Sequence, residues 1–257
     1  MTRPTDKDSV KRCFFISGSG RSGTQWLSAL MRESPNAFIQ HEWHKLRYGA
    51  LEPMHNEAVG LPHRERVPSW VALRLRATRA AFRECGKEVY GECGNKTRYA
   101  LAELEREFEP VFMLQLVRDG RDVVRSFYSR QTYTGHDLHL PLVPGPRNSY
   151  AARWDHIERF EKLCWLWSFT VEMVDFHTRG NFVRFEDLLT SHDVLQAKIL
   201  EPAGMTIAKP ILESYVGRRI DRSHQPLKLP HWTEWDDQHT SLFWGICEDM
   251  MQRFDYD

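Results

Sequence analysis

The feature that most constrains this chain is a glycine-rich loop between an apolar run and an amphipathic stretch. The run from Cys13 to Ser17 predicts a buried strand, and apolar residues at helical spacing after Gly23 predict a helix. The loop between them reads GSGRSG, and its glycines let backbone N–H groups turn inward around an anion. The helix that follows adds the positive end of its dipole. The sequence therefore predicts a strand–loop–helix unit that binds a phosphate-like group.

This loop lacks the lysine that nucleotide-hydrolysing loops carry. Gly18 and Gly23 have the G-x-x-x-x-G spacing, but Thr24 and Gln25 stand where Lys and Ser or Thr follow in a nucleotide triphosphatase. Arg21 lies inside the loop, where it supplies positive charge and a bidentate fork of donors. The combination of Arg, Ser, Gly and Thr directly after an apolar strand favours an anion-binding function over an ordinary turn.

Apolar runs and helical patterns alternate along the whole chain. We expect strands within 38–40, 89–96, 111–117 and 181–189, and helices within 23–33, 71–85, 98–108, 118–131, 154–176 and the last 20 residues. This alternation predicts a three-layer α/β/α fold around a central parallel sheet, like that of the P-loop NTPases, in a single domain spanning 1–257. Ligands of such sheets bind beyond the carboxyl ends of the strands.

Several segments carry no regular pattern. Residues 1–11 are expected to be a disordered lead, and 49–70 an irregular excursion. The loop 132–150, rich in Gly, Pro, His and Asn, is expected to act as a lid or substrate loop. The arginines of the helix at 71–85 are expected to form a solvated face.

Composition narrows the class of protein. Lys and Arg balance Asp and Glu at 35 each, which argues against a nucleic-acid partner. The five cysteines form no CxxC pair, so we expect neither disulfides nor a zinc site, and thiols in a reducing compartment fit better. No signal-peptide core or membrane-length apolar run occurs. We therefore expect a soluble cytoplasmic protein that does not bind membranes.

A second motif, LVRDGRDVVRSFYSR (116–130), begins as the strand at 111–117 ends. Arg118 follows the strand, and Ser126 lies eight residues later, two turns into the next helix, so both side chains can face the strand's end. Arginine and serine together suit a phosphate monoester. We interpret Arg121 and Asp122 as a structural ion pair at the turn.

These two motifs resemble those of the sulfotransferases that use PAPS (3′-phosphoadenosine 5′-phosphosulfate). RSGTQW resembles the family's 5′-phosphosulfate loop, and LVRDGRDVVRSFYSR its 3′-phosphate motif. GNKTRYAL (94–101) is similar to a segment of the tyrosyl-protein and heparan sulfate branches, and FVRFEDLL (182–189) to the family's Val-Arg-Tyr-Glu-Asp-Leu strand. The similarity runs from residue 14 to about 235 in the family's order.

The resemblance implies a role for each matching residue. The 5′-phosphosulfate would be bound by Arg21, Ser22, Gly23, Thr24 and Gln25. Trp26 would pack on adenine, or else belong to the core. The 3′-phosphate would be bound by Arg118 and Ser126, with help from Arg130. The stretch from Arg222 and Ser223 to Lys228 falls where the family clamps the cofactor, although its Arg-Lys-Gly triplet is missing here. Lys96 would stabilise charge at the transferring group, or else be a surface lysine.

Sulfuryl transfer needs a base that removes the acceptor's proton. QHEWHK offers His41, Glu42 and His44. Glu42 falls where the tyrosyl-protein branch has its glutamate base, so the resemblance favours Glu42, with His41 or His44 as the alternatives. His136 and His139 are reserve candidates whose expected role is substrate contact.

The predicted function is transfer of a sulfuryl group from PAPS to a hydroxyl or amine of a small, partly apolar acceptor. The transfer would release PAP (3′-phosphoadenosine 5′-phosphate) and require no metal. Two other functions remain open. A small-molecule kinase would use ATP–Mg²⁺, and a non-catalytic nucleotide-binding protein would tolerate loss of Glu42 and Lys96.

Overall fold

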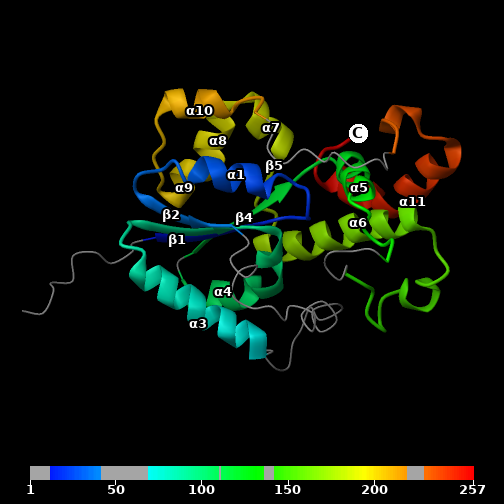
Figure 1. The fold of residues 1–257 in the computed structure, drawn as a ribbon, viewed down its shortest axis with the longest axis horizontal. Coiled ribbons are helices and arrows are strands. Elements are labelled where there is room, and N and C mark those ends of the chain that lie inside the picture. The colour runs from blue at the N-terminus through cyan, green and yellow to red at the C-terminus, as the bar shows by residue number, and fades with distance from the viewer. Residues whose placement is uncertain (1–11, 42–68, 110, 136–141, 219–228) are drawn as a thin grey trace, which may run out of the picture.

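Five parallel strands form one sheet in the order β2–β3–β1–β4–β5 (Figure 1). The structure is a computed structural model that describes residues 12–41, 69–109, 111–135, 142–218 and 229–257. The strands are β1 (Arg12–Ser17), β2 (Ala37–Gln40), β3 (Val89–Cys93), β4 (Val111–Val117) and β5 (Phe182–Arg184).

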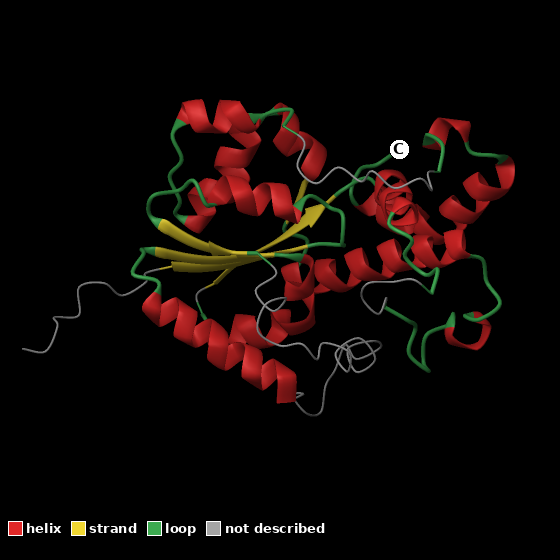
Figure 2. Ribbon diagram, in the orientation of Figure 1, coloured by secondary structure: helices red, strands yellow, loops and turns green. Residues whose placement is uncertain are grey.

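Helices cover both faces of this sheet, as Figure 2 shows. One face carries α1 (Thr24–Met31), α7 (Phe185–Thr190), α8 (His192–Leu195), η4 (Gln196–Leu200), α9 (Glu201–Ala203) and α10 (Lys209–Tyr215). The other carries α3 (Ser69–Glu84) and α4 (Leu101–Glu107), which follows the 3₁₀ turn η2 (Asn95–Ala100). Packed together beside the carboxyl end of β4 are α5 (Gly120–Ser129), α6 (Arg159–Thr178) and α11 (Asp237–Arg253). Two short 3₁₀ turns are η3 (Ala151–Arg153) and η5 (Trp232–Glu234). The predicted three-layer α/β/α fold is confirmed.

The central strand β1 is buried on both faces. Phe14 and Ile16 pack into the core beneath α1, whereas Cys13 and Phe15 pack into the core beneath α3 and α4. A continuous apolar run is therefore expected, because every side chain of such a strand faces a helix layer. Gly91 pairs with Phe14, and a Cβ there would lie 2.0 Å from the Phe14 ring.

Most predicted elements match the structure, with differences at their ends. Strand β4 has the predicted bounds, but α6 begins at Arg159, five residues later than its apolar pattern suggested. Trp154, which contributed to that pattern, instead packs edge-on against Trp165, with ring centroids 4.9 Å apart. Among the described residues, no helix is both long and apolar enough to cross a bilayer.

The expectation that all the arginines of α3 face solvent is wrong at Arg74. This side chain is 3% exposed and forms an ion pair with Glu92 of β3 at 2.6 Å. Glu92 also accepts hydrogen bonds from Thr78 at 2.9 Å and from Tyr90 at 2.8 Å. Arg74 therefore ties α3 to the sheet, which helical periodicity alone did not reveal because Glu92 belongs to a distant strand.

Replacing Glu92 by Gln should destabilise the protein, because it leaves the Arg74 guanidinium buried without its counter-charge. We expect the free energy of unfolding to fall by about 3–5 kcal/mol, the usual range when one partner of a buried pair is removed. Urea unfolding followed by circular dichroism measures the change. Glu107→Gln is the matched control, because Glu107 pairs with Arg79 at the surface. Equal stability of Glu92→Gln and wild type would contradict a stabilising role for this pair.

The same comparison made at lower pH tests the charge of Glu92. Burial raises the pKa of Glu92, but the charge of Arg74 and hydrogen bonds from Tyr90, Arg74 and Thr78 outweigh it, and the pKa lies below its ordinary value. A carboxyl whose pKa is lowered on folding stabilises the fold above its unfolded-state pKa, and the contribution disappears as pH falls through the folded-state value. The stability difference between wild type and Glu92→Gln should therefore shrink on acidification.

Candidate functional site

The glycine-rich loop after β1 packs directly against the ends of other elements. A Cβ on Gly18 would lie 2.2 Å from the Leu116 carbonyl oxygen of β4, and one on Gly20 would lie 2.8 Å from the Phe127 ring of α5. Gly23 has φ 98°, and a Cβ there would lie 2.4 Å from the ring of Phe185. Only glycine fits at these positions without a shift of the neighbouring groups.

The amino-terminal end of α1 is open to an anion. Gly23 stands at the cap position, so no side chain caps the helix, and its first turn carries no acidic residue. By contrast, Asp119 caps α5 and Asp236 caps α11. The loop residues Arg21 and Gly23 both have positive φ, at 70° and 98°, and turns with left-handed residues can direct successive N–H groups toward an anion. In the described part of the chain, no side-chain cap therefore occupies the first N–H groups of α1.

Hydroxyl groups line the inner side of the loop. Ser22 is fully buried, and its hydroxyl donates to the Ser19 carbonyl at 2.8 Å, which closes the turn. The hydroxyl of Ser19 is also buried and has no hydrogen-bond partner among the described residues. An orphaned hydroxyl of this kind fits a loop built to hold an oxyanion.

The two sequence motifs meet at this loop. Arg21 Nε donates to the hydroxyl of Ser126 at 2.9 Å, across 105 residues of sequence. Arg118 Nη1 donates to the Arg21 carbonyl at 3.3 Å. The carboxyl ends of β1 and β4 therefore bring two guanidinium groups and a serine together, as expected for neighbouring parallel strands.

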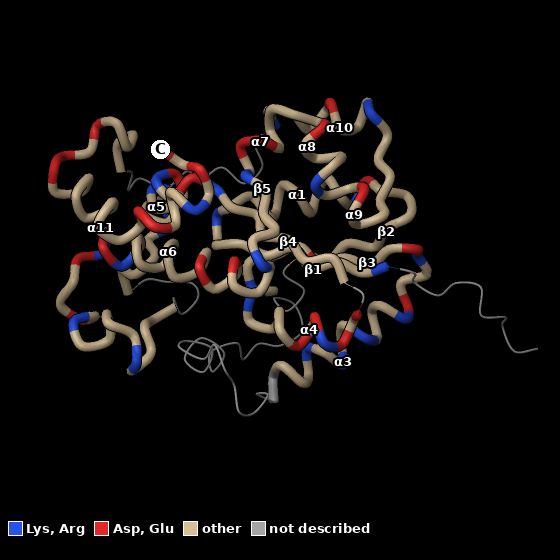
Figure 3. The backbone as a smooth tube through the Cα atoms, turned by 180° about the vertical axis from the view of Figure 1, so that it is seen from behind, with Lys and Arg blue, Asp and Glu red and all other residues tan. Residues whose placement is uncertain are grey.

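The predicted ion pair between Arg121 and Asp122 is wrong. Arg121 pairs with Asp119 at 2.7 Å, while Asp122 accepts from Arg118 at 3.1 Å and from Arg125 at 3.0 Å. The reason is helical geometry, because residues three and four apart share a face and adjacent residues do not. The side chain of the cap residue Asp119 instead accepts a hydrogen bond from the Arg121 N–H, with 2.8 Å between Oδ1 and the amide nitrogen. Figure 3 shows basic and acidic positions of the backbone close together around α5.

The carboxyl end of β3 forms a further side of the site. Gly94 donates its N–H to the Ile16 carbonyl at 3.0 Å and accepts a hydrogen bond from Ser17 at 3.2 Å. These contacts fix the start of η2, which carries Lys96. The Lys96 carbonyl accepts from the buried Arg74 at 3.0 Å.

His41 follows β2, and its ring orientation is fixed by a backbone contact. Nδ1 lies 2.7 Å from the Cys93 carbonyl oxygen, which can only accept, so Nδ1 carries the proton and the basic lone pair of the neutral ring is on Nε2. The Cys93 thiol donates to the Thr24 carbonyl of α1 at 3.4 Å. Cys93 therefore links His41 to the glycine-rich loop.

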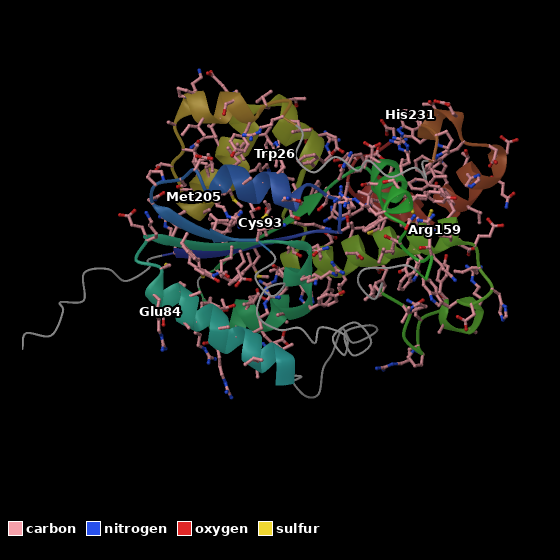
Figure 4. All side chains as sticks on the ribbon, in the orientation of Figure 1. Trp26, Glu84, Cys93, Arg159, Met205 and His231 are labelled. Atoms are coloured by element: carbon pink, nitrogen blue, oxygen red, sulfur yellow. The ribbon has the colours of Figure 1, made fainter. Side chains whose placement is uncertain are left out.

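The remaining predicted residues fall into three groups. Thr24 is buried, while Gln25 and Arg130 are exposed. Trp26, labelled in Figure 4, is 3% exposed and packs edge-on against Phe185 and Tyr215 in the layer of α1 and α7–α10. The predicted residues that lie outside the described part of the chain are Glu42, His44, His136, His139, Ser223 and Lys228.

Sequence reasoning missed two aromatic groups at the site. Phe185 lies between Gly23, Trp26 and Arg118, whose guanidinium is 5.8 Å from the ring centroid. Phe127 joins the loop to an aromatic cluster formed by Tyr99, Tyr133, Leu142, Tyr150, Trp154, Trp165, Leu166, Phe169 and Ile246. Phe185 lies within the FVRFEDLL motif and could have been found from it. The aromatic cluster could not be predicted from a local sequence pattern, because its members come from distant segments.

No group of three or more metal-ligating side chains is found in the described part of the chain. No protein-family model matches this chain, and no curated protein matches its sequence.

The solved structures that match this chain include two bacterial sulfotransferases. A sulfotransferase from Alicyclobacillus acidocaldarius has a TM-score of 0.47 and 13% identity, over 100% of this chain and 98% of that one. A sulfotransferase from Mycobacterium avium has a TM-score of 0.53 and 10% identity, over 96% of this chain and 78% of that one. The second likeness shows that this chain has the fold of that sulfotransferase.

Replacing Gly20 by Ala should destabilise the loop by forcing the new methyl group into Phe127. We expect a cost of about 1–3 kcal/mol in the free energy of unfolding, typical of overpacking. Because Gly20 does not have a positive φ, the cost is steric, and a smaller partner should relieve it. In a double-mutant cycle measured by urea unfolding, Gly20→Ala should cost less in a Phe127→Leu background. Strictly additive effects would show that the loop does not pack on α5 as described.

Proposed function

We propose that this protein is a sulfotransferase that moves a sulfuryl group from PAPS to a small-molecule acceptor. The observation that carries this proposal is the meeting of Arg21, Arg118 and Ser126 beside the uncapped end of α1. Two guanidinium groups and a helix end provide positive potential for a ligand with two separate phosphate-like groups. The likeness of the fold to a known sulfotransferase supports the same reading.

The residues divide between the two ends of this donor. Loop amides, Arg21 and the hydroxyl of Thr24 would hold the 5′-phosphosulfate, while Arg118 and Ser126 would hold the 3′-phosphate. The predicted hydroxyl contact of Ser22 is replaced by a supporting role, because this buried hydroxyl already donates its proton to the Ser19 carbonyl. Arg21 Nε and the Ser126 hydroxyl are hydrogen-bonded to each other at 2.9 Å. Oxygen atoms of a bound donor would replace part of this hydrogen bond. The orphaned hydroxyl of Ser19 is a further donor within the loop.

The adenine of the donor needs an apolar surface near Arg118. Phe185 is half-buried and lies between Gly23 and Arg118, whereas Trp26 is covered by Phe185 and Tyr215. Stacking of adenine on Trp26 would therefore require one of these rings to move. We propose Phe185 as the ring that adenine meets first.

When bound, PAPS supplies an activated sulfuryl group whose departure leaves charge on the 5′-phosphate of PAP. Arg21, the loop amides and Lys96 would stabilise that developing charge, because fixed donors aimed at a transition-state oxyanion need no reorganisation. The acceptor oxygen or nitrogen forms its bond to sulfur as the bond from sulfur to the phosphate oxygen breaks. The acceptor's proton goes to a base on the protein.

His41 and Glu42 are the two leading candidates for that base. His41 has its Nδ1 proton fixed by the Cys93 carbonyl, so Nε2 is the atom that would accept a proton. Because Cys93 also contacts Thr24, His41 is tied to the loop that would hold the sulfuryl group. Glu42 is its direct neighbour in sequence and has the position of the base in the tyrosyl-protein branch.

The acceptor we propose is small and partly apolar. Tyr99 and Trp165 are buried in the aromatic cluster, whereas Phe127 and Trp154 are half-buried. Phe127 packs against the glycine-rich loop at Gly20, so half-buried rings on this side of the loop would favour a planar or apolar acceptor over a long charged chain. A hydroxyl and an amine both remain possible attacking groups.

PAP should raise the midpoint of thermal unfolding, because a ligand that binds only the folded state stabilises it by mass action. At a concentration of about 100 times the dissociation constant the gain is about 2.7 kcal/mol. Arg118→Ala should abolish this effect. Arg125→Ala is the matched control, since it also removes a partner of Asp122 but leaves Arg118 in place. Stabilisation by ATP–Mg²⁺ and not by PAP would contradict the proposal and favour a kinase.

Replacing His41 by Ala should lower kcat in a coupled assay of PAP release with an acceptor found by screening. Loss of a general base commonly costs about 10²–10⁴-fold. The affinity for PAP should be nearly unchanged, because the contact of His41 with the Cys93 carbonyl lies away from the predicted phosphate-binding side chains Arg21, Arg118 and Ser126. The parallel variant Glu42→Gln is the comparison. A large loss of kcat in Glu42→Gln with a small one in His41→Ala would assign the base to Glu42.

A further inference from the structure

The last four residues of the sequence lie against the segment that carries Arg118. Helix α11 ends at Arg253, and the chain then runs beside the amino-terminal end of α5, where Figure 1 shows its red end. Phe254 is fully buried and Tyr256 is 8% exposed. These residues are therefore a packed part of the fold, far in sequence from the glycine-rich loop.

One carboxylate connects this segment to the backbone after Arg118. The Tyr256 hydroxyl donates to Glu186 Oε2 at 2.7 Å, and the Asp119 N–H donates to Glu186 Oε1 at 3.2 Å. Glu186 thus bridges a phenol from one end of the sequence and an amide at the start of α5. Burial and the neighbouring carboxylate raise the pKa of Tyr256 well above its ordinary value, so the phenol stays a donor.

Two arginines hold the same segment in place. Arg121, which pairs with Asp119, also donates to the Asp257 carbonyl at 2.5 Å. Arg184 donates to the Asp255 carbonyl at 2.9 Å. Asp255 is therefore held by the end of β5, and Asp257 by the first turn of α5.

The position of the turn at Asp119 determines the positions of the Arg118 and Ser126 side chains. Asp119 follows Arg118 directly and is the cap of α5, and Ser126 lies on that helix two turns further along. A shift of the Asp119 backbone would move both side chains relative to Arg21. A carboxylate held by hydrogen bonds on both oxygens resists such a shift better than one held on a single side.

We propose that Tyr256 is a positioning residue for the donor's 3′-phosphate: through Glu186 it fixes the Asp119 backbone and so aims Arg118 and Ser126. This inference rests on the proposed function, because it assigns the phosphate to that motif. The phenol itself touches neither the donor nor the reacting atoms. Its effect is therefore on donor affinity and not on the chemical step.

The test uses the full chain with Tyr256→Phe, which removes one oxygen and keeps the ring. Tyr215→Phe is the matched control, because Tyr215 is equally buried, at 6% exposed, and its hydroxyl also donates to a carboxylate, Glu33, at 3.1 Å. The first readout is hydrogen exchange of the Asp119 amide by NMR, which needs no ligand. The second is the dissociation constant of PAP, and the third is kcat at saturating PAPS.

We expect Tyr256→Phe to speed exchange at Asp119 and to weaken PAP binding about tenfold, a change of about 1.4 kcal/mol. The control should change neither, and kcat at saturating PAPS should stay within twofold, roughly the range of an unperturbed step. Adding Tyr256→Phe to Glu186→Gln should weaken PAP binding less than it does in wild type, since both changes break one bridge.

Three results would overturn the inference. Unchanged exchange at Asp119 would show that Tyr256 does not fix this amide. Faster exchange with unchanged PAP affinity would show a purely structural contact. An equal loss of affinity in Tyr215→Phe would show a general effect of destabilisation. If the wild-type protein does not bind PAP at all, the proposed function fails, and exchange at Asp119 still decides whether Tyr256 fixes the turn.

Discussion

The close approach of a glycine-rich loop to three other elements is the constraint on which this structure depends. Gly18, Gly20 and Gly23 leave no room for a side chain against Leu116, Phe127 and Phe185, which come from β4, α5 and α7. The loop cannot change shape without moving these elements, and they cannot move without releasing the loop. Steric contacts thus fix the relative positions of segments that lie far apart in the sequence, and they hold the loop whose backbone donors would bind the proposed anion.

The acidic side chains around this loop pair with the basic ones and hold them in position. Asp122 is shared by Arg118 and Arg125, and Asp119 by Arg121 and the helix it caps, so the acidic groups near α5 hold the arginines in place. On the α3 side, Glu92 has the same role for Arg74, which in turn reaches the Lys96 carbonyl. The buried Glu92 and the half-buried Asp119 and Asp122 therefore hold the basic residues in place, while the uncapped end of α1 keeps its positive potential.

The sequence alone predicted those elements of the fold that depend on residues adjacent or nearly adjacent in the chain. The apolar run of β4 and the loop at 18–23 depend on neighbouring residues, and the eight-residue spacing from Arg118 to Ser126 follows from helical geometry. The partner of Arg121, the burial of Arg74 and the bridge from Tyr256 depend on contacts between distant segments, which a local pattern does not encode. The same limit explains α6, because Trp154 fits a helical period yet packs against Trp165 from outside the helix.

The position of Tyr256 bears on how such a site can be tuned. Under the proposed function, the glycine-rich loop would bind through backbone donors whose geometry is set by steric contacts. Arg118 and Ser126 would instead bind through side chains on a turn and a helix. Their precision depends on whatever holds Asp119, and here that support comes from the Glu186 bridge and the cap of α5. Substitutions behind the site, at residues that never touch a ligand, can therefore alter donor affinity while leaving the loop that would carry the chemistry unchanged.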